Sequence, residues 1–580
     1  MNKLSLKFIY IAFAIMIIGK LIFWHGHPLF TCSDQAAYLE MAIQIAAGKL
    51  PYVDFFEWNP PLIMYLNLIP VILSRLTHAP PIECFNYSII ALCAFSAFMS
   101  LHIANKYMSK QQFLVFLPLI FAATFYNLDQ TINIGEREHI FIISYLPFLI
   151  LRGLAWQGKQ ISKAEAILAG LVAGIGMALK PQFVASAALV EFCFYSQFKT
   201  LKTFARSEIV TVAIVFVGYI FGLMLLPTAV WDTYLNQVVP LYISGLSYSS
   251  RALIHMLRVD PNYYMHFVHL LITLPVALVF SRYNQWIAPL GIFALSFVFH
   301  YIYGDQAWPY RFMPMSASLY MLDGLLIGML IKKVFERLGL APFTGFVLSC
   351  TIFGTACYST FNEIKGEMEN REGNPMVFDL FKTGYQGSCL SSDFDPLLFS
   401  ILSQTQIDDS VIFIGNGIDP GYPAILQSGR KAGSRYLFCT LPYIDHSFNQ
   451  SKDPKWKEMA DQVVANYGQD IINNKPAVIY IQLRQMEDLL TQHRFLERFM
   501  ANYKLAGETD LYKVWTRTGA ENSGEAQSHS VSKDATERSK RAIEKQTEVD
   551  EHINRLNSEI KQLQSENAQL KQELKKARGN

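Results

Sequence analysis

Apolar runs long enough to cross a bilayer recur along the first 360 residues of this 580-residue chain and constrain its fold more than any other feature. A transmembrane helix needs roughly 20 consecutive apolar residues. Only 17% of the residues are charged, against about 25% in an average soluble domain. We therefore expect a polytopic α-helical membrane protein with about eleven transmembrane helices. The segments are 6–24, 83–105, 111–128, 140–157, 163–179, 182–198, 208–226, 264–281, 286–303, 310–331 and 342–360.

Basic residues fall in every second connection between these segments, and this alternation predicts the orientation of the chain. The positive-inside bias places the basic connections in the cytoplasm. The other connections, and everything after residue 360, are then expected on the outer face. Residues 61–77 are interpreted as a surface helix that begins at a double proline, because a crossing there would break the alternation. The three long outer loops are 25–82, 129–139 and 227–263.

Four consecutive polar side chains stand where the second outer loop meets a membrane segment. The sequence "GEREH" places Glu136, Arg137, Glu138 and His139 at the boundary of the bilayer. Ionisable groups in such positions are costly in lipid and by default line a polar cavity. The alternative is an internal Arg–Glu network that only joins the loop to the helix.

Two further cations stand at the ends of apolar segments. Lys180 precedes Pro181, which should break the helix there and leave the lysine in a turn that lines a cavity. Arg311 stands where a helix re-enters the membrane, and its guanidinium could bind a phosphate through two parallel hydrogen bonds. The alternative for both residues is an anchor whose charged end extends to the lipid headgroups.

The composition changes after the last apolar segment. Residues 373–517 contain three short apolar runs, "DSVIFIGN", "SRYLFCTL" and "PAVIYIQL", which suit buried strands. Helical patterns alternate with these runs, so we expect a small outer α/β domain with a largely parallel sheet. The domain would bind a substrate or cover the opening of a site in the membrane part.

The residue pattern at the end of the chain predicts association with a second helix. Residues 519–540 are polar and are expected to be a disordered linker. Residues 543–578 carry a heptad seam with β-branched residues opposite leucine and one buried asparagine, Asn567. This pattern favours a parallel two-stranded coiled coil, either a homodimer or a pair with another protein. Whether disulfides join Cys32 to Cys84 and Cys389 to Cys439 is left open.

The first outer loop carries a motif that resembles a known family. An acid follows the first helix, then G-x-x-P-Y-x-D, then aromatic-x-P-P-L-x-x-Y-L. This arrangement resembles the GT-C membrane glycosyltransferases, in particular the protein O-mannosyltransferases and aminoarabinose transferases. The resemblance covers residues 1–517. It implies transfer of a sugar from a polyprenyl phosphate to a glycan, lipid or protein acceptor, on the periplasmic face of a bacterial inner membrane.

The resemblance also implies roles for individual residues. Inversion at the anomeric carbon needs a base that takes the acceptor proton, and Asp34 is the candidate. The phosphate leaving group needs cations or positioned donors. The candidate catalytic residues are Asp34, Glu136 and Glu138, and the candidate substrate-binding residues are Tyr38, Asp54, Trp58, Arg137, His139, Lys180 and Arg311.

Two positions depart from the family pattern. Relatives commonly have Asp-Glu after the first helix, whereas this chain has Asp34-Gln35. This departure argues against a second ligand from this loop and weakens the case for a metal site, so we expect no cofactor; a divalent cation is left open, without a clear set of ligands. Many relatives have histidine where this chain has Arg311.

Two other functions are retained as alternative hypotheses. One is an outer-face polysaccharide polymerase or ligase, although these enzymes lack the first-loop acid followed by P-P-L. The other is a transporter, or a scaffold assembled by its coiled coil. Transporters show internal repeats, and no repeat is found in this sequence.

Overall fold

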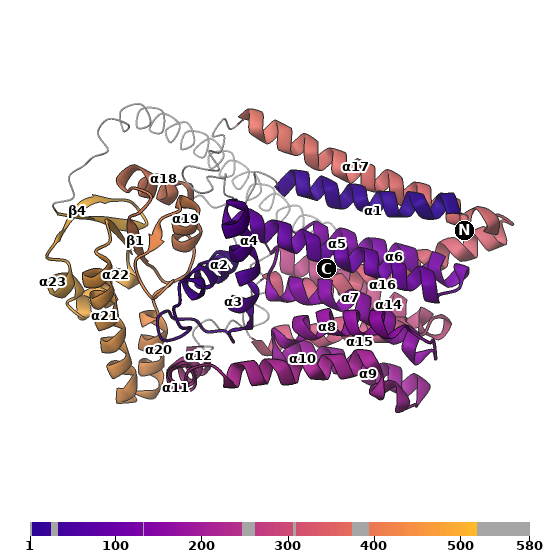
Figure 1. Cartoon of the computed structure of the whole chain (residues 1–580), viewed down its shortest axis with the longest axis horizontal. Helices are drawn as coiled ribbons and strands as arrows, with labels where there is room; N and C mark the ends of the chain where they lie inside the picture. Colours follow the sequence, from indigo (N-terminus) through magenta and orange to yellow (C-terminus); the bar gives the residue numbers. More distant parts are fainter. Residues whose placement is uncertain are drawn as a thin grey trace, which may run out of the picture. The chain divides into compact units, whose positions relative to one another are not determined.

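Figure 1 shows a computed structural model of the chain, which describes residues 3–24, 33–130, 133–245, 261–304, 309–373 and 394–518. The chain divides into two compact units, Met1–Thr518 and Gly519–Asn580. The predicted linker and coiled coil, together with Cys32 and Cys389, lie outside the described residues. Cys84 and Cys439 are buried free thiols.

A helix stands at each of the eleven apolar segments. Among the described residues, eight helices are long and apolar enough to cross a membrane, so the chain is a polytopic helical membrane protein. The number of crossings remains a prediction. The helices are α1 (Lys3–Trp24), α5 (Pro81–Tyr107), α6 (Lys110–Leu128), α7 (Arg137–Trp156), α8 (Lys163–Ala178), α9 (Pro181–Phe198), α10 (Ser207–Met224), α14 (Pro261–Phe280), α15 (Ile287–Gly304), α16 (Met313–Arg337) and α17 (Thr344–Gly373).

The connections carry shorter elements. The first outer loop contains two helical regions, one of them at the surface helix predicted for residues 61–77, and this one is divided at Asn67, the residue between α3 and α4. Short helices and helical turns form the other elements of the described connections. The elements are α2 (Ser33–Ala46), α3 (Leu62–Leu66), α4 (Leu68–Thr77), η1 (Lys202–Ala205), α11 (Thr228–Thr233), η2 (Tyr234–Val238), α12 (Val239–Gly245), η3 (Ser281–Tyr283), η4 (Pro309–Phe312) and η5 (Ala341–Phe343).

Two glycines let α16 pack closely against α6. A Cβ atom on Gly324 would lie 2.6 Å from the carbonyl oxygen of Pro118, and one on Gly328 would lie 2.2 Å from that of Val115. Small residues four apart allow membrane helices to approach this closely, because they place no side chain between the two backbones. This contact fixes α16, which begins directly after η4.

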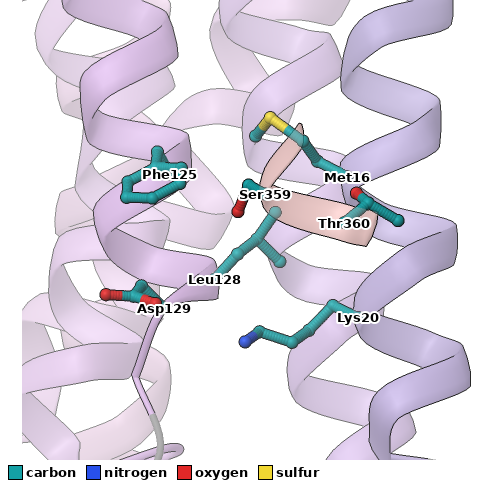
Figure 2. Close-up of a pocket in the computed structure, with 7 residues that line it drawn as sticks. All are labelled: Met16, Lys20, Phe125, Leu128, Asp129, Ser359 and Thr360. Carbon is teal, nitrogen blue, oxygen red and sulfur yellow. The ribbon is translucent and has the colours of Figure 1, made fainter. Parts of the chain in front are cut away.

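A small polar pocket lies where α1, α6 and α17 meet. Its volume is about 10 Å³, roughly the space of one water molecule. Figure 2 shows Lys20 and Asp129 among its lining side chains. Lys20 is buried, and its charge acts on the carboxylate of Asp129. A buried cation without a counter-charge is costly in a membrane protein. The carboxylate of Asp129 supplies such a counter-charge for Lys20 within α1.

Residues 394–518 form a five-stranded sheet with helices on both faces. The strand order is β2-β1-β3-β5-β4, with β2, β1 and β3 parallel and β5 antiparallel to both of its neighbours. The prediction of a largely parallel sheet is therefore wrong for half of the strand pairs. The elements are α18 (Phe394–Gln404), β1 (Ser410–Ile414), α19 (Gly421–Ser428), β2 (Lys431–Ala432), α20 (Leu441–Ser451), α21 (Pro454–Asn474), β3 (Val478–Gln482), α22 (Gln485–Gln492), α23 (Phe495–Phe499), β4 (Tyr503–Glu508) and β5 (Tyr512–Arg517).

Side chains along β1 and β3 point alternately to the two faces of the sheet, and helices cover both faces. Val411 and Tyr480 point to one side and belong to the core that includes α18 and α19. Ile412 and Ile479 point to the other side and pack with α20, α21 and α22. Because successive side chains of a strand face opposite ways, a continuous apolar run supplies both cores.

One predicted strand is absent. The run "SRYLFCTL" does not form a strand, and both carboxylate oxygens of Asp470 accept hydrogen bonds at its start. The backbone N–H of Arg435 donates to Asp470 at 2.9 Å, and its guanidinium donates at 2.8 Å. The segment therefore forms a loop that is tied to α21.

We expect Gly328→Ala to destabilise the helical part, because the new methyl group would meet the backbone of Val115. Overpacking of this kind costs about 1–3 kcal/mol. Thermal denaturation in detergent should show a lower midpoint for this variant. Gly222→Ala is the matched control, since a Cβ there meets nothing within 4 Å. Equal midpoints for the two variants would contradict the close α6–α16 contact.

Candidate active site

Polar side chains from four separate elements converge at one place. Asp34 lies in the first turn of α2, Arg137 and Glu138 lie in the first turn of α7, Lys180 lies between α8 and α9, and Arg311 lies in η4. We call these five residues the charged cluster. The charges of the other four all act on the carboxyl of Asp34, so the structure brings together residues that the sequence placed in four different loops.

The start of α7 is fixed by a tight turn. Gly135 has a φ of +71°, and a Cβ there would meet the ring of Phe85 at 2.2 Å, so a side chain would be strained. The backbone N–H of Gly135 donates to Nδ1 of His139 at 2.9 Å, and Nε2 of His139 lies 2.9 Å from the carbonyl oxygen of Asn127. Both ring nitrogens are thus used within the protein, and His139 holds the turn.

Lys180 is placed by the proline that follows it. Pro181 opens α9, and Lys180 precedes it with extended backbone angles, as the residue before a proline prefers. Its Nζ donates to Oε1 of Glu138 at 2.5 Å and lies 5.3 Å from the centre of the Tyr310 ring. This buried ion pair joins the turn between α8 and α9 to the start of α7.

Asp34 and Tyr38 share one face of α2, four residues apart. The guanidinium of Arg137 lies 5.8 Å from the centre of the Tyr38 ring. Burial raises the pKa of Asp34 above its usual value, while the charges of Arg137 and Lys180 oppose this rise. A carboxylate with a raised pKa accepts a proton more readily near neutral pH, as a general base requires.

Glu136 is fully buried as the N-cap residue of α7. Its charge acts on the hydroxyls of Tyr38 and Tyr310. A carboxylate at this position also interacts favourably with the helix dipole. Glu136 therefore lies beside the charged cluster.

Two residues predicted for substrate binding lie elsewhere. Asp54 is exposed, and its carboxylate accepts a hydrogen bond from the backbone N–H of Leu50 at 2.7 Å, so it stabilises its own turn. Trp58 packs in an aromatic group with Phe438 and Tyr443 of the α/β domain. Neither of these contacts involves a residue of the charged cluster, and the part of Asp54 and Trp58 in substrate binding stays a prediction.

Sequence analysis did not assign a role to Glu57 or Asn59. Asn59 accepts a hydrogen bond from Nη1 of Arg137 through its side-chain oxygen, and its side-chain nitrogen donates to Glu57. Burial raises the pKa of Glu57 to about 7, although the hydrogen bonds from Asn59 and the charge of Arg137 lower it. The sequence signal that was available is an acid and an amide within the three residues before the double proline of the motif.

Several polar atoms of the site lack a hydrogen-bond partner among the described residues. They are Oη of Tyr38, Nε of Arg137 and Oε2 of Glu138, and all three are buried. Buried polar atoms in native proteins are nearly always paired. A hydroxyl, a guanidinium N–H and a carboxylate oxygen at one place are suited to a polar ligand that both donates and accepts. In the part of the chain that the structure describes, no three His, Cys, Asp or Glu side chains are grouped to hold a metal ion.

Comparisons with known proteins identify the fold. The chain matches no protein-family model, and no curated protein matches it. Solved structures do match, and the class they define is the GT-C fold of membrane transferases. Two of them are structures of ArnT from Cupriavidus metallidurans.

The ArnT structure bound to undecaprenyl phosphate has a TM-score of 0.50 and 11% sequence identity, covering 88% of this chain and 98% of the ArnT chain. The apo structure has a TM-score of 0.52 and 12% identity, covering 88% and 96%. At this identity the similarity concerns the fold, and it confirms the fold that the first-loop motif predicted.

We expect Glu57→Gln to stabilise the protein at pH 8 but not at pH 5. Folding raises the pKa of Glu57 from 4.5 to about 7, so stability falls as pH rises between these values and stays reduced above them. Glutamine resembles the protonated acid and can still accept from Asn59. The gain at pH 8 should be on the order of 2 kcal/mol, measured as a higher midpoint of thermal denaturation.

The exposed residue Glu336 provides the control for this test. Glu336→Gln should shift the midpoint at neither pH. A gain from Glu57→Gln of the same size at pH 5 and pH 8 would show that ionisation of Glu57 is not the cause.

Proposed function

We propose that this protein is a membrane glycosyltransferase that moves a sugar from a polyprenyl-phosphate donor to a glycan, lipid or protein acceptor, with inversion at the anomeric carbon. The observation that carries the proposal is the charged cluster, where three cations and two carboxylates meet beside polar atoms that have no hydrogen-bond partner within the described part of the chain. The fold adds support, because an ArnT of the same fold has been solved with undecaprenyl phosphate bound.

The cations would bind the donor phosphate. Arg137, Lys180 and Arg311 all act on Asp34 electrostatically, so a phosphate near that carboxylate lies within reach of their charges. Guanidinium groups pair with phosphate oxygens through parallel hydrogen bonds. As the bond between the anomeric carbon and the phosphate oxygen breaks, negative charge develops on the phosphate, and these cations stabilise it.

Asp34 would act as the base. The acceptor nucleophile attacks the anomeric carbon from the face opposite the phosphate, and Asp34 takes its proton as the new bond forms. The electron pair of the broken bond leaves with the polyprenyl phosphate. Glu138 holds Lys180 in place, and its second oxygen, which lacks a partner among the described residues, is available to orient the acceptor.

The proposal includes an orientation. The alternation of basic connections favours the charged cluster and residues 394–518 on the periplasmic face of a bacterial inner membrane. A polyprenyl-linked donor would present its head group at the same boundary. The C-terminal coiled coil would pair two such enzymes or bind another protein.

We expect Asp34→Asn to lower sugar transfer by about 10²–10⁴-fold, because an amide cannot accept the proton. Transfer is measured with purified protein in lipid, against a panel of polyprenyl-phosphate sugars. Asp54→Asn is the matched control and should keep near wild-type activity, since that carboxylate stabilises its own turn. Wild-type turnover in Asp34→Asn would rule out Asp34 and direct the search to Glu136 and Glu138.

Labelling of single cysteines tests the orientation. Cysteines introduced at the exposed positions Lys110 and Asp408 should differ in intact cells, with position 408 modified by a membrane-impermeant thiol reagent and position 110 protected. Lysis of the cells should expose both. Labelling of position 110 in intact cells would reverse the proposed arrangement.

A further inference from the structure

The segment Phe56–Asn59 contacts two parts of the protein through alternate residues. Phe56 and Trp58 contact the α/β domain, whereas Glu57 and Asn59 contact the residues around Arg137. The contacts of alternate residues thus lie on two different sides of the segment. The same four residues therefore lie between the domain and the charged cluster.

On the side of the cluster, every polar group of Asn59 is engaged. Its side-chain oxygen accepts from Nη1 of Arg137, and its side-chain nitrogen donates to Oε1 of Glu57. Its backbone N–H donates to the same carboxylate oxygen at 2.8 Å. The hydroxyl of Tyr52 donates to its carbonyl oxygen at 2.5 Å. Asn59 is thus held from three directions while it orients the guanidinium.

On the side of the domain, the contacts are a backbone hydrogen bond and stacked rings. The N–H of Phe56 donates to the carbonyl oxygen of Arg435 at 2.9 Å. The ring of Trp58 lies 5.8 Å from that of Phe438 at an angle of 22°, and 5.4 Å from that of Tyr443. Arg435 is itself paired with Asp470 of α21 at 2.8 Å, which ties this loop to the core of the domain.

We propose that Asn59 is a positioning residue that orients Arg137 for the donor phosphate, and that the α/β domain sets its position through Phe56 and Trp58. This inference rests on the proposed function, because it takes Arg137 as a phosphate ligand. It gives the α/β domain a part in donor binding through contacts to the first outer loop. A guanidinium that stays oriented before the ligand arrives loses less freedom on binding.

The test measures binding of undecaprenyl phosphate to the full-length protein in nanodiscs. Asn59→Ala should weaken binding about tenfold, the effect of losing one hydrogen bond to a charged group. Arg137→Ala should weaken it at least as much. The double variant should bind like Arg137→Ala alone, because Asn59 acts through that arginine.

Asn59→Gln separates positioning from simple damage to the fold. Glutamine keeps an amide oxygen for Arg137 and an amide nitrogen for Glu57 without adding a charge, so binding should return to within about threefold of wild type. If Asn59→Gln binds as weakly as Asn59→Ala, the amide of Asn59 does not orient Arg137 and the inference is overturned.

A second pair of variants tests the contribution of the domain. Phe438→Ala should weaken binding about threefold, by loss of the ring that stacks on Trp58, and should add nothing to Asn59→Ala. Phe495→Ala truncates an equally buried ring of the same domain, whose ring contacts are with Tyr467 and Phe499, and should leave binding unchanged. Equal effects of Phe438→Ala and Phe495→Ala would show a loss of domain stability only and would overturn the coupling.

The outcomes separate the two proposals. If the wild-type protein does not bind undecaprenyl phosphate, the proposed function fails and the inference fails with it. If the wild-type protein binds, but Asn59→Ala adds its full effect to Arg137→Ala, the proposed function stands and the inference alone is wrong.

Discussion

The buried ion pair between Lys180 and Glu138 is the interaction on which the rest of the site depends. Taking both charges out of water is costly, and removing one partner would leave the other uncompensated at a cost of about 3–5 kcal/mol. The pair joins the turn between α8 and α9 to the start of α7 at 2.5 Å. Because this ion pair holds the start of α7, the neighbouring Arg137 reaches the ring of Tyr38 on α2 and the side chain of Asn59 in the first outer loop.

Much of the fold and part of the site could be predicted from the sequence, because lipid enforces simple rules. The length of the apolar runs predicted the helices. Asp34, Glu138 and Lys180 could be singled out because ionisable groups at the ends of apolar segments are costly at a bilayer boundary. Asn59 could not be found in this way. Its amide carries no charge, and its partner Arg137 is 78 residues away in the sequence.

Other features could not be predicted for a related physical reason. Asp54 and Trp58 belong to the motif, but a motif does not tell which way each side chain of a loop points, and their role in substrate binding stays a prediction. The parallel sheet was expected from apolar runs alone, whereas the pairing of β5 with β3 is antiparallel. Pairing direction depends on how the chain returns to the sheet, and neither hydropathy nor local propensity records that path.

The glycine contact between α6 and α16 has a mechanical consequence. Arg311 sits in the short turn η4 that leads directly into α16, so its position follows that of the helix. Backbone packed against backbone leaves no side chain that could adjust, since even a Cβ atom on Gly324 or Gly328 would meet a carbonyl oxygen. Under the proposed function, the protein must admit and release a lipid-linked substrate. The tight contact restricts how far α16 can contribute to that rearrangement, so Arg311 is expected to keep its place relative to α6.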